Sequence, residues 1–426
     1  MNLGKVSIVG LGYVGLPLAL EFAKVGLTVF GIEQNPAKVE KVNRGESYIE
    51  DVDSKELSNV VSSGRLKAFT EFYPVKDSDA VVICVPTPLT LHKEPDISYI
   101  VNVTNEITKF LKKGHLIVLE STTYPGTTEE VLIPILEKSG LKSGIDFYVA
   151  FSPERVDPGN KKFSMRDIPK VVGGINGEST ELAGKLYSYI TDKVYPVSSP
   201  RVAEMEKLLE NMFRLVNISF INELALLCQR MDIDIWEVIS AASTKPYGFM
   251  PFYPGPGLGG HCIPIDPFYL SWKAKEYDFD VRFIELAGEI NDSMPYHIVE
   301  MVMKALNAYK KALNGSRVLV IGVAYKPNVA DPRESPVLKI IPELENMGAL
   351  VEYYDPYIRE IKIDNRLYTS TDLTKEKIKD FDCILIVTDH NDIDYNLIYE
   401  NAQLIVDTRN ALRKRGISTN ERVIRL

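Results

Sequence analysis

The chain of 426 residues is too long for one hydrophobic core, and 45% hydrophobic with 25% charged residues is an ordinary composition for a globular protein of two or three domains. A formal net charge of −9 argues against nucleic acid as the main partner, because binding a phosphate backbone requires a basic face. The first residues, MNLGKVSIVG, enter a strand pattern without the features of a leader, and no apolar run reaches the ~18 residues of a membrane span, so we expect a cytoplasmic protein.

Short apolar runs alternate with helical patterns over residues 1–196. Strands are predicted at KVSIVG, LTVFGIE, AVVICVP, HLIVLEST, FYVAFSPE and PKVVGG, and helices at LPLALEFAKVG and ISYIVNVTNEITKFLKKG. This alternation predicts an α/β domain with a parallel sheet covered by helices on both faces.

Residues 197–313 carry helical patterns without strands. The segment RVAEMEKLLENMFRLVNISFINELALLCQRMDID is one helical stretch without Gly or Pro, which suits a spacer or a dimer face and equally an ordinary core helix. Strands return after Asn314–Ser316 in RVLVIGVAY, ALVEYYDP, FDCILIVTD and AQLIVDT, so a second α/β domain is predicted over residues 314–426.

A glycine motif, G-x-G-x-x-G, follows the first predicted strand at Gly10, Gly12 and Gly15, and the second strand ends in an acid, Glu33. Such glycines permit a tight turn and let a pyrophosphate approach the backbone at a helix N-terminus. A carboxylate at Glu33 suits the adenosine ribose diol and repels a 2′-phosphate, which favours NAD over NADP. A glycine-rich turn without a ligand is the alternative.

Ligands of open parallel sheets lie past the carboxyl ends of the strands. Three polar residues follow predicted strands in this way: Thr87 in CVPTP, Thr122 in LESTTYPG and Glu154 in FSPER.

Cys262 lies in the loop GLGGHCIPIDP, whereas Cys84, Cys228 and Cys383 lie in apolar strand or helix patterns typical of buried cysteines. Three roles are open for Cys262. The first is a metal ligand beside His261, although no second Cys/His pair has zinc spacing. The second is an inert loop residue, and the third, which we favour, is a covalent nucleophile. With NAD, a nucleophilic thiolate implies oxidation of an alcohol through a thiohemiacetal and a thioester to an acid.

Such chemistry needs further polar groups. Lys207 and Asn211 in EKLLEN are four residues apart on one helix face and suit a developing oxyanion, and Asp266 and Glu154 suit positioning or activation of water. Each of these residues, taken alone, also fits a solvated surface position.

The chain resembles the UDP-glucose/GDP-mannose dehydrogenase family, the four-electron nucleotide-sugar 6-dehydrogenases, over nearly its whole length. The resemblance rests on GLGYVGLPLA, VPTP, ESTTYPGTTEE, FSPER, EKLLENMFRLVNISFINEL, GPGLGGHCIPIDP, AYKPNVADPRESP and VDTRN. It implies an NAD-binding Rossmann domain (1–196), a central all-helical domain with the catalytic cysteine loop and the dimer interface (197–313), and a Rossmann-like domain that holds the UDP-sugar (314–426).

The resemblance also implies roles for individual residues and no metal. Cys262 would be the nucleophile, Lys207 and Asn211 would hold the C6 oxygen, and Asp266 and Glu154 would serve proton transfer and hydrolysis, with Thr122 on a bound water. The implied cofactor contacts are Gly10, Gly12, Tyr13, Val14, Gly15, Glu33, Thr87, Thr122 and Arg333. The implied substrate contacts are Glu154, Arg155, Lys207, Asn211, Tyr253, Gly255, Gly257, Gly259, Lys326 and Arg409.

The sugar is less defined by the sequence. The cysteine loop and ESTTYPGTTEE resemble the UDP-N-acetylglucosamine 6-dehydrogenases of surface-polysaccharide pathways most, and Ile265 stands where UDP-glucose enzymes tend to have lysine. UDP-N-acetylmannosamine and UDP-glucose remain alternative substrates. A non-catalytic regulator that binds NAD and a nucleotide sugar is an alternative of another class, and a two-electron dehydrogenase would leave Cys262 unexplained.

Overall fold

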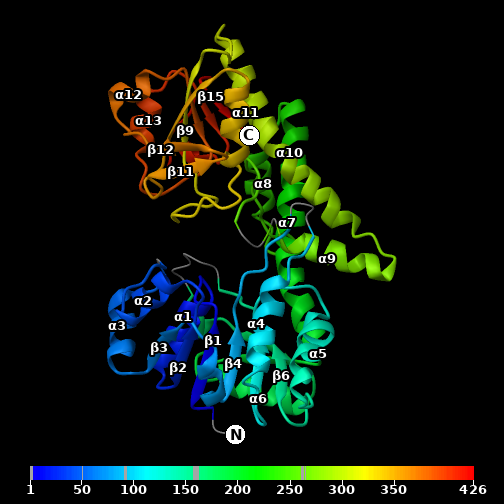
Figure 1. The fold of residues 1–426 in the computed structure, drawn as a ribbon. Helices are drawn as coiled ribbons and strands as arrows, with labels where there is room; N and C mark the ends of the chain where they lie inside the picture. Colours follow the sequence, from blue (N-terminus) through cyan, green and yellow to red (C-terminus); the bar gives the residue numbers. More distant parts are fainter. Residues whose placement is uncertain (1–2, 50, 91–93, 157–162, 261–262, 264) are drawn as a thin grey trace. The chain divides into compact units, whose positions relative to one another are not determined.

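The computed structural model describes residues 3–49, 51–90, 94–156, 163–260, 263 and 265–426 (Figure 1). The chain forms two compact units, residues 1–210 with 268–279 and residues 211–267 with 280–426. One helix, α7 (Pro200–Arg230), contributes its first part to the first unit and the remainder to the second.

The first unit is built on an eight-stranded sheet in the order β3-β2-β1-β4-β5-β6-β7-β8 (Figure 1). Its strands are β1 (Lys5–Val9), β2 (Thr28–Ile32), β3 (Leu66–Phe69), β4 (Ala80–Ile83), β5 (Leu116–Leu119), β6 (Tyr148–Phe151), β7 (Lys170–Gly174) and β8 (Val194–Val197). Its helices include α1 (Gly15–Lys24), α2 (Pro36–Asn43), α3 (Ser54–Ser62), α4 (Ser98–Thr108), α5 (Ile133–Leu136), α6 (Gly177–Tyr187) and most of α9 (Asp266–Ala274).

Both faces of this sheet are buried, as predicted. Along β4 every residue is buried, but Val82 packs in the core formed with α1 and α6, whereas Val81 and Ile83 pack in the core formed with α4. Side chains that alternate between two apolar cores explain why the central strands are continuous hydrophobic runs.

The sheet differs from the predicted parallel sheet at one edge. Strands β1 to β6 are parallel, but β7 runs antiparallel to β6, and β8 is parallel to β7. The strands β3 and β8 were not predicted, because LKAF and VYPV are short and expose part of their residues, so they lack a buried apolar run. The reversal at β7 matters because its first residue, Lys170, lies at the edge where β1 to β6 end.

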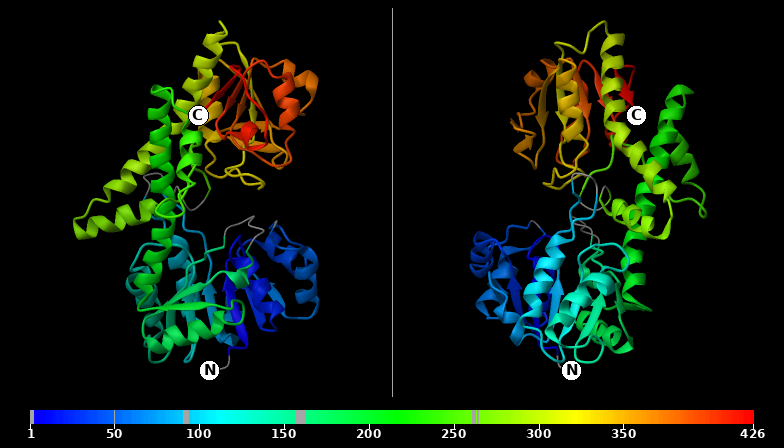
Figure 2. Two further views of the ribbon diagram at one scale, coloured as in Figure 1. Left: turned by 180° about the vertical axis from the view of Figure 1, so that it is seen from behind. Right: turned by 45° about the vertical axis from the view of Figure 1, so that its right-hand side comes forward.

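The second unit combines helices with a five-stranded parallel sheet in the order β10-β9-β13-β14-β15 (Figure 2). Its strands are β9 (Arg317–Ile321), β10 (Leu350–Tyr354), β13 (Cys383–Ile386), β14 (Ile405–Asp407) and β15 (Val423–Arg425), with a separate antiparallel hairpin of β11 (Glu360–Ile363) and β12 (Arg366–Thr369). Its helices are the second part of α7, α8 (Ile235–Ala242), α10 (Arg282–Ala308), α11 (Val337–Asn346), α12 (Lys375–Lys379), α13 (Tyr395–Asn401) and α14 (Ala411–Lys414).

The helix α10 joins the helical part of this unit to its sheet. Met294, Ile298 and Val302 of α10 are fully buried in one core with Val318 and Val320 of β9. The α/β class and the succession of α/β, helical and α/β segments are therefore confirmed. In the parts of the chain that the structure describes, no helix combines the length and apolar character of a membrane crossing.

Candidate active site

The turn between β1 and α1 has room for a ligand at one glycine and none at the other two. A Cβ on Gly10, whose φ is +91°, would lie 2.5 Å from the carbonyl oxygen of Cys84, and one on Gly15 would lie 1.8 Å from that of Gly10. A Cβ on Gly12 would meet no described atom within 4 Å. Gly10 and Gly15 thus permit the turn and the close packing of helix on strand, and Gly12 leaves the backbone open to a pyrophosphate.

The N-terminus of α1 fits an anion, because Val14 stands at the N-cap and no described side chain caps the helix there. Tyr13 is 47% exposed beside it. Glu33 follows β2 and is held by the backbone: its Oε2 accepts from Leu11 N at 3.2 Å and its Oε1 from Asn35 N at 3.0 Å. A carboxylate fixed in this way retains acceptor positions for the ribose hydroxyls of NAD.

The carboxyl edge of the same sheet carries the other polar residues predicted for this unit. Thr87 is buried and Thr122 half-buried, each a few residues beyond β4 or β5, and Glu154 follows β6. The main-chain oxygen of Glu154 accepts a hydrogen bond from Lys207 Nζ at 2.5 Å. Glu154 and Lys207 are therefore brought together, on a loop and on α7.

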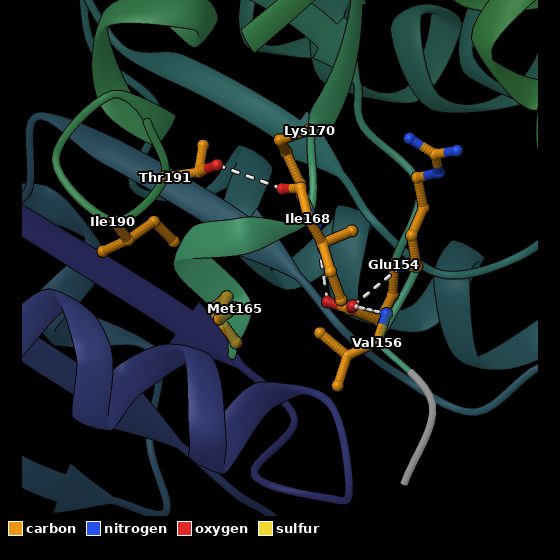
Figure 3. Close-up of a pocket in the computed structure, with 8 residues that line it drawn as sticks. Glu154, Val156, Met165, Ile168, Lys170, Ile190 and Thr191 are labelled. Atoms are coloured by element: carbon orange, nitrogen blue, oxygen red, sulfur yellow. Dashed lines mark hydrogen bonds and ion pairs between the residues drawn. The ribbon is translucent and has the colours of Figure 1, made fainter. Parts of the chain in front are cut away.

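The carboxylate of Glu154 is well anchored (Figure 3). Its Oε1 accepts from Arg155 N at 2.7 Å and Val156 N at 2.5 Å, and its Oε2 lies 3.3 Å from Lys170 Nζ. Burial raises the pKa of this carboxyl, but Lys170, the Val156 N–H and Lys207 outweigh that effect and hold the pKa below its usual value. Glu154 is thereby kept ionised and able to accept a proton.

Arg155, expected to contact substrate, is engaged by carboxylates of α7. Its Nε donates to Glu210 Oε1 at 3.1 Å and lies 3.3 Å from Glu206 Oε1, and its Nη1 donates to Pro169 O at 2.8 Å. These bonds tie the loop after β6 to α7, on which Lys207 lies.

In the second unit, Asn211 and Asp266 are in direct contact. Asn211 Nδ2 donates to Asp266 Oδ2 at 2.5 Å, Arg214 donates to Asn211 Oδ1, and both Asn211 and Asp266 are buried. Asp266 is the first residue of α9, four residues after Cys262. Cys262 and His261 lie outside the described residues.

The glycine-rich segment before the cysteine packs against two loops of the C-terminal sheet. A Cβ on Gly255 would lie 2.5 Å from Arg409 Nη1, and one on Gly259 would lie 2.6 Å from Glu334 O. Gly257 has a φ of +122°. The loop that contains Glu334 also carries Lys326, so three predicted parts of the substrate site converge here.

Two further predicted contact residues, Tyr253 for the substrate and Arg333 for NAD, interact with neighbouring side chains of the second unit. Tyr253 stacks on Trp236, with ring centroids 6.0 Å apart, and is 50% exposed. Arg333, expected to touch NAD, belongs to the second unit and forms an ion pair of 2.6 Å with Asp331 on its own loop.

Three other cysteines have surroundings unlike those of a reactive thiol. Cys84 and Cys383 are buried, and burial raises the pKa of both, to about 12 for Cys383. Cys228 is half-buried on α7, and all three are free.

Sequence reasoning missed several residues that support these groups. Asn222 Oδ1 accepts from Gly255 N at 2.9 Å and Asn291 Oδ1 accepts from Leu258 N at 2.6 Å, which fixes the glycine-rich segment. Glu204, fully buried, accepts from Gly126 N at 2.6 Å and Thr128 N at 2.9 Å. For Asn222 the sequence contained a signal in its helical spacing, because it lies on the same side of α7 as Lys207, Asn211 and Arg214.

The sequence matches all three models of one family: its NAD binding domain over residues 4–191, its central domain over 201–293 and its UDP binding domain over 319–414. The chain belongs to the UDP-glucose/GDP-mannose dehydrogenase family. It is therefore an NAD-dependent nucleotide-sugar dehydrogenase, and the residues around the β1–α1 turn fit that cofactor.

Relatives within the family differ in the sugar that their names state. The chain is 40% identical over 356 residues, 83% of either chain, to the UDP-N-acetyl-D-glucosamine 6-dehydrogenase of Pseudomonas aeruginosa. It is 34% identical over 417 residues, 96% of either chain, to the UDP-N-acetyl-D-mannosamine dehydrogenase of Pyrococcus horikoshii. A solved structure of the UDP-D-ManNAc dehydrogenase from Pyrococcus horikoshii superposes with a TM-score of 0.89 at 32% identity, over 99% of this chain and 98% of the other.

Proposed function

We propose that the chain oxidises the C6 hydroxyl of a UDP-N-acetylhexosamine to the carboxylic acid in a four-electron, NAD-dependent reaction, with UDP-N-acetylglucosamine as the favoured sugar. The observation that carries the proposal is the pair of contacts one turn apart on α7: Lys207 with the Glu154 loop and Asn211 with Asp266. These four groups are the ones that such a reaction requires around a nucleophilic cysteine.

In the proposed reaction, bound NAD supplies the two-electron acceptor for each of two oxidations. The thiolate of Cys262 adds to the carbonyl carbon of the aldehyde, and the resulting thiohemiacetal is oxidised to a thioester. Lys207 and Asn211 donate hydrogen bonds to the oxygen on C6 as negative charge develops there. Water then cleaves the carbon–sulfur bond, which yields the acid and returns the thiol.

The carboxylates of Glu154 and Asp266 are proposed to serve proton transfer and the hydrolysis of the thioester. Glu154, held ionised by its neighbours, accepts a proton from the attacking water, which Thr122 helps to position. Asp266 orients Asn211 through their hydrogen bond and lies near the start of α9, close in sequence to the cysteine. The residues Tyr253, Gly255, Gly257, Gly259, Lys326 and Arg409 are proposed to hold the UDP-sugar, and Arg333 to reach NAD.

The identity of 40% to a UDP-N-acetylglucosamine 6-dehydrogenase supports the favoured sugar. UDP-N-acetylmannosamine is the second candidate, supported by the mannosamine dehydrogenases that match 96% of the chain. The two sugars are epimers at C2, and the convergence of Gly255, Arg409 and the Lys326 loop does not by itself favour either.

We also propose a homodimer formed through α7. Large apolar side chains are exposed at helical spacing along this helix, among them Met205 (38%), Leu209 (60%), Phe213 (47%) and Phe220 (53%). A row of exposed apolar residues of this length is typical of a surface that a partner covers, and a second copy of the chain presents the same row.

Product stoichiometry tests the proposal. Purified protein is incubated with excess NAD and limiting UDP-N-acetylglucosamine, UDP-N-acetylmannosamine, UDP-N-acetylgalactosamine or UDP-glucose, and the NADH formed is measured at the end point. Two NADH per sugar, with no aldehyde trapped by a hydrazine, are expected with one N-acetylhexosamine. One NADH per sugar, or oxidation of UDP-glucose alone, would overturn it.

The covalent step has its own control. C262S should form no acid, and C228S, which changes a half-buried cysteine of α7, should retain the wild-type rate. Acid formation by C262S at the wild-type rate would exclude the thioester route.

A further inference from the structure

Lys170 is the first residue of β7, which is antiparallel to β6. The register pairs Phe151 with Gly173, so continuing it by three residues brings Lys170 opposite Glu154. The side chains meet there, with Lys170 Nζ 3.3 Å from Glu154 Oε2 (Figure 3). Because β7 is antiparallel, its first residue places the Lys170 ammonium at the edge of the sheet where the parallel strands end.

A second carboxylate holds Lys170 from the other side. Glu120 follows β5 directly, its side chain has no exposed surface, and its Oε1 forms an ion pair with Lys170 Nζ. Tyr187 of α6 donates a hydrogen bond to Glu120 Oε2 at 3.1 Å, and Lys170 Nζ lies 5.0 Å from the centre of the Tyr187 ring. Only 9% of the Lys170 side chain and 14% of the Glu154 side chain are exposed.

Glu120 is sealed, whereas the side chains of Lys170 and Glu154 each keep a small exposed surface. Lys170 and Glu154 line one small pocket together with Val156, Met165 and Ile168 (Figure 3). Burial raises the pKa of Glu120 to about 7, despite the opposing effect of Lys170. The pKa of Lys170 is raised, because the two carboxylates outweigh the effect of its burial.

We propose that Lys170 is a positioning residue of the reaction: fixed from behind by Glu120 and Tyr187, its ammonium orients the Glu154 carboxylate and keeps it ionised. The inference rests on the proposed function, because it assigns Lys170 an action through the base that the proposal names. Lys170 contacts Glu154 directly, whereas the roles of Glu120 and Tyr187 are to hold the ammonium in place.

Several charged or titratable groups surround Glu154, and they come from different elements. They are Lys170 of β7, Glu120 after β5, Cys84 after β4, Lys207 of α7 and the adjacent Arg155. Lys170 is the member whose ammonium is bonded to the carboxylate itself. Its removal should therefore change the ionisation of Glu154 in a direction that the charge dictates.

The experiment compares Lys170→Met, Lys170→Arg, Glu120→Gln and the double variant Lys170→Met/Glu120→Gln. Removing a cation bonded to a carboxylate should move the acidic limb of the kcat–pH profile upward by about 1 to 3 pH units. It should also lower kcat at pH 7 about tenfold or more, a part of the ~10²–10⁴-fold that a positioned base contributes. Lys170→Arg should restore both.

Glu120→Gln is the matched control within the same buried cluster. Its amide oxygen still accepts from Lys170, and its amide nitrogen can donate to the hydroxyl oxygen of Tyr187. Glu120 is itself protonated at the acidic pH where Glu154 titrates, so the acidic limb should stay at the wild-type position. The double variant removes one buried positive and one buried negative charge together, so it should fold even if Lys170→Met does not, and it should still show the raised limb. An acidic limb in the double variant equal to that of Glu120→Gln would overturn the proposal.

Glu154→Gln separates this inference from the proposed function. If Glu154→Gln retains the wild-type pH profile, the proposed role of Glu154 is wrong and the inference about Lys170 fails with it. If Glu154→Gln loses the acidic limb but Lys170→Met keeps the limb at the wild-type pH, only the inference about Lys170 fails. Infrared difference titration gives a readout without turnover: the carboxyl band that is absent in Glu154→Gln should appear at higher pH in the double variant than in Glu120→Gln.

Discussion

Asn211 Nδ2 donates a hydrogen bond to Asp266 Oδ2 at 2.5 Å, and this bond joins α7 to the first residue of α9 in the second unit. Both side chains are buried, so neither partner is replaced readily by water. The amide is held with its nitrogen toward Asp266 and its oxygen toward Arg214. The first prediction follows from this orientation.

The variant N211D should lower kcat at least about tenfold at pH 7, because it places two carboxylates in contact and removes the donor that we propose for the C6 oxygen. The measurement is steady-state kcat together with the binding of NAD, which should be unchanged. N217D, farther along α7, where the amide donates to Phe213 O, serves as the control and should keep the wild-type kcat. Equal losses in the two variants would contradict this role of Asn211.

Gly12 and Gly15 should respond differently to alanine. In G15A the new Cβ would lie 1.8 Å from Gly10 O, so the variant should be destabilised by more than about 1 kcal/mol and should lower the melting temperature. In G12A the Cβ meets no described atom within 4 Å, so the fold should persist while the affinity for NAD falls about tenfold or more. Melting curves and calorimetric titration with NAD distinguish the two, and an unchanged NAD affinity in G12A would place the pyrophosphate elsewhere.

Asp234 predicts a pH dependence of stability. It caps α8, accepting from Trp236 N at 3.0 Å, and it forms ion pairs of 2.8 Å with Arg413 and Arg425. Burial raises the pKa of this carboxyl, but the Arg425 contact and its other partners outweigh burial, so the pKa lies below the usual 3.8. Its stabilisation is therefore fully present above pH 3.8 and is lost as the pH falls through the folded-state pKa.

D234A should lose about 1–2 kcal/mol of unfolding free energy at pH 7, because cap and ion pairs are both removed. D234N should lose less, because an asparagine oxygen still caps the helix. Urea unfolding followed by tryptophan fluorescence measures both variants, and the difference between D234N and wild type should shrink below pH 3.8. A difference that grows on acidification would refute the assignment.

The apolar row on α7 predicts the oligomeric state. L209K and F220K place charges on side chains that are 60% and 53% exposed in the isolated chain, so they should convert a dimer to a monomer in sedimentation velocity without lowering the melting temperature of the monomer. I145K, at a 77% exposed position outside α7, is the control and should remain a dimer. A wild-type monomer at micromolar concentration would overturn the proposed interface.

The central strands of the first sheet were predictable because β4 and β5 are fully buried and form uninterrupted apolar runs. The direction of β7 was not, since KVVGG is equally apolar in either direction and the reversal appears only in the pairing of β7 with β6. β12 and β15 escaped prediction because each buries only one residue, whereas β14, as short as β15, is buried throughout. β11 escaped prediction because its alternation of polar and apolar residues extends over only four positions.

The candidate site divides in the same way. Glu33, Glu154 and Lys207 were predictable, because motif spacing and strand ends depend on local sequence. Lys170 and Glu120 were not, because 50 residues separate them and the antiparallel register that unites them is a tertiary property. The roles assigned to the site residues and the limits of the three domains stay predictions.

The continuity of α7 restricts how the length of this segment can vary in evolution. Lys207 and Asn211 lie one turn apart on a helix that has no break between them. A single inserted or deleted residue at this point would rotate everything beyond it by about 100° and turn Asn211 away from the side on which Lys207 lies. Homologous chains should therefore accept changes of side chain between these two positions far more readily than changes of spacing, whereas loops outside the helix are free to lengthen.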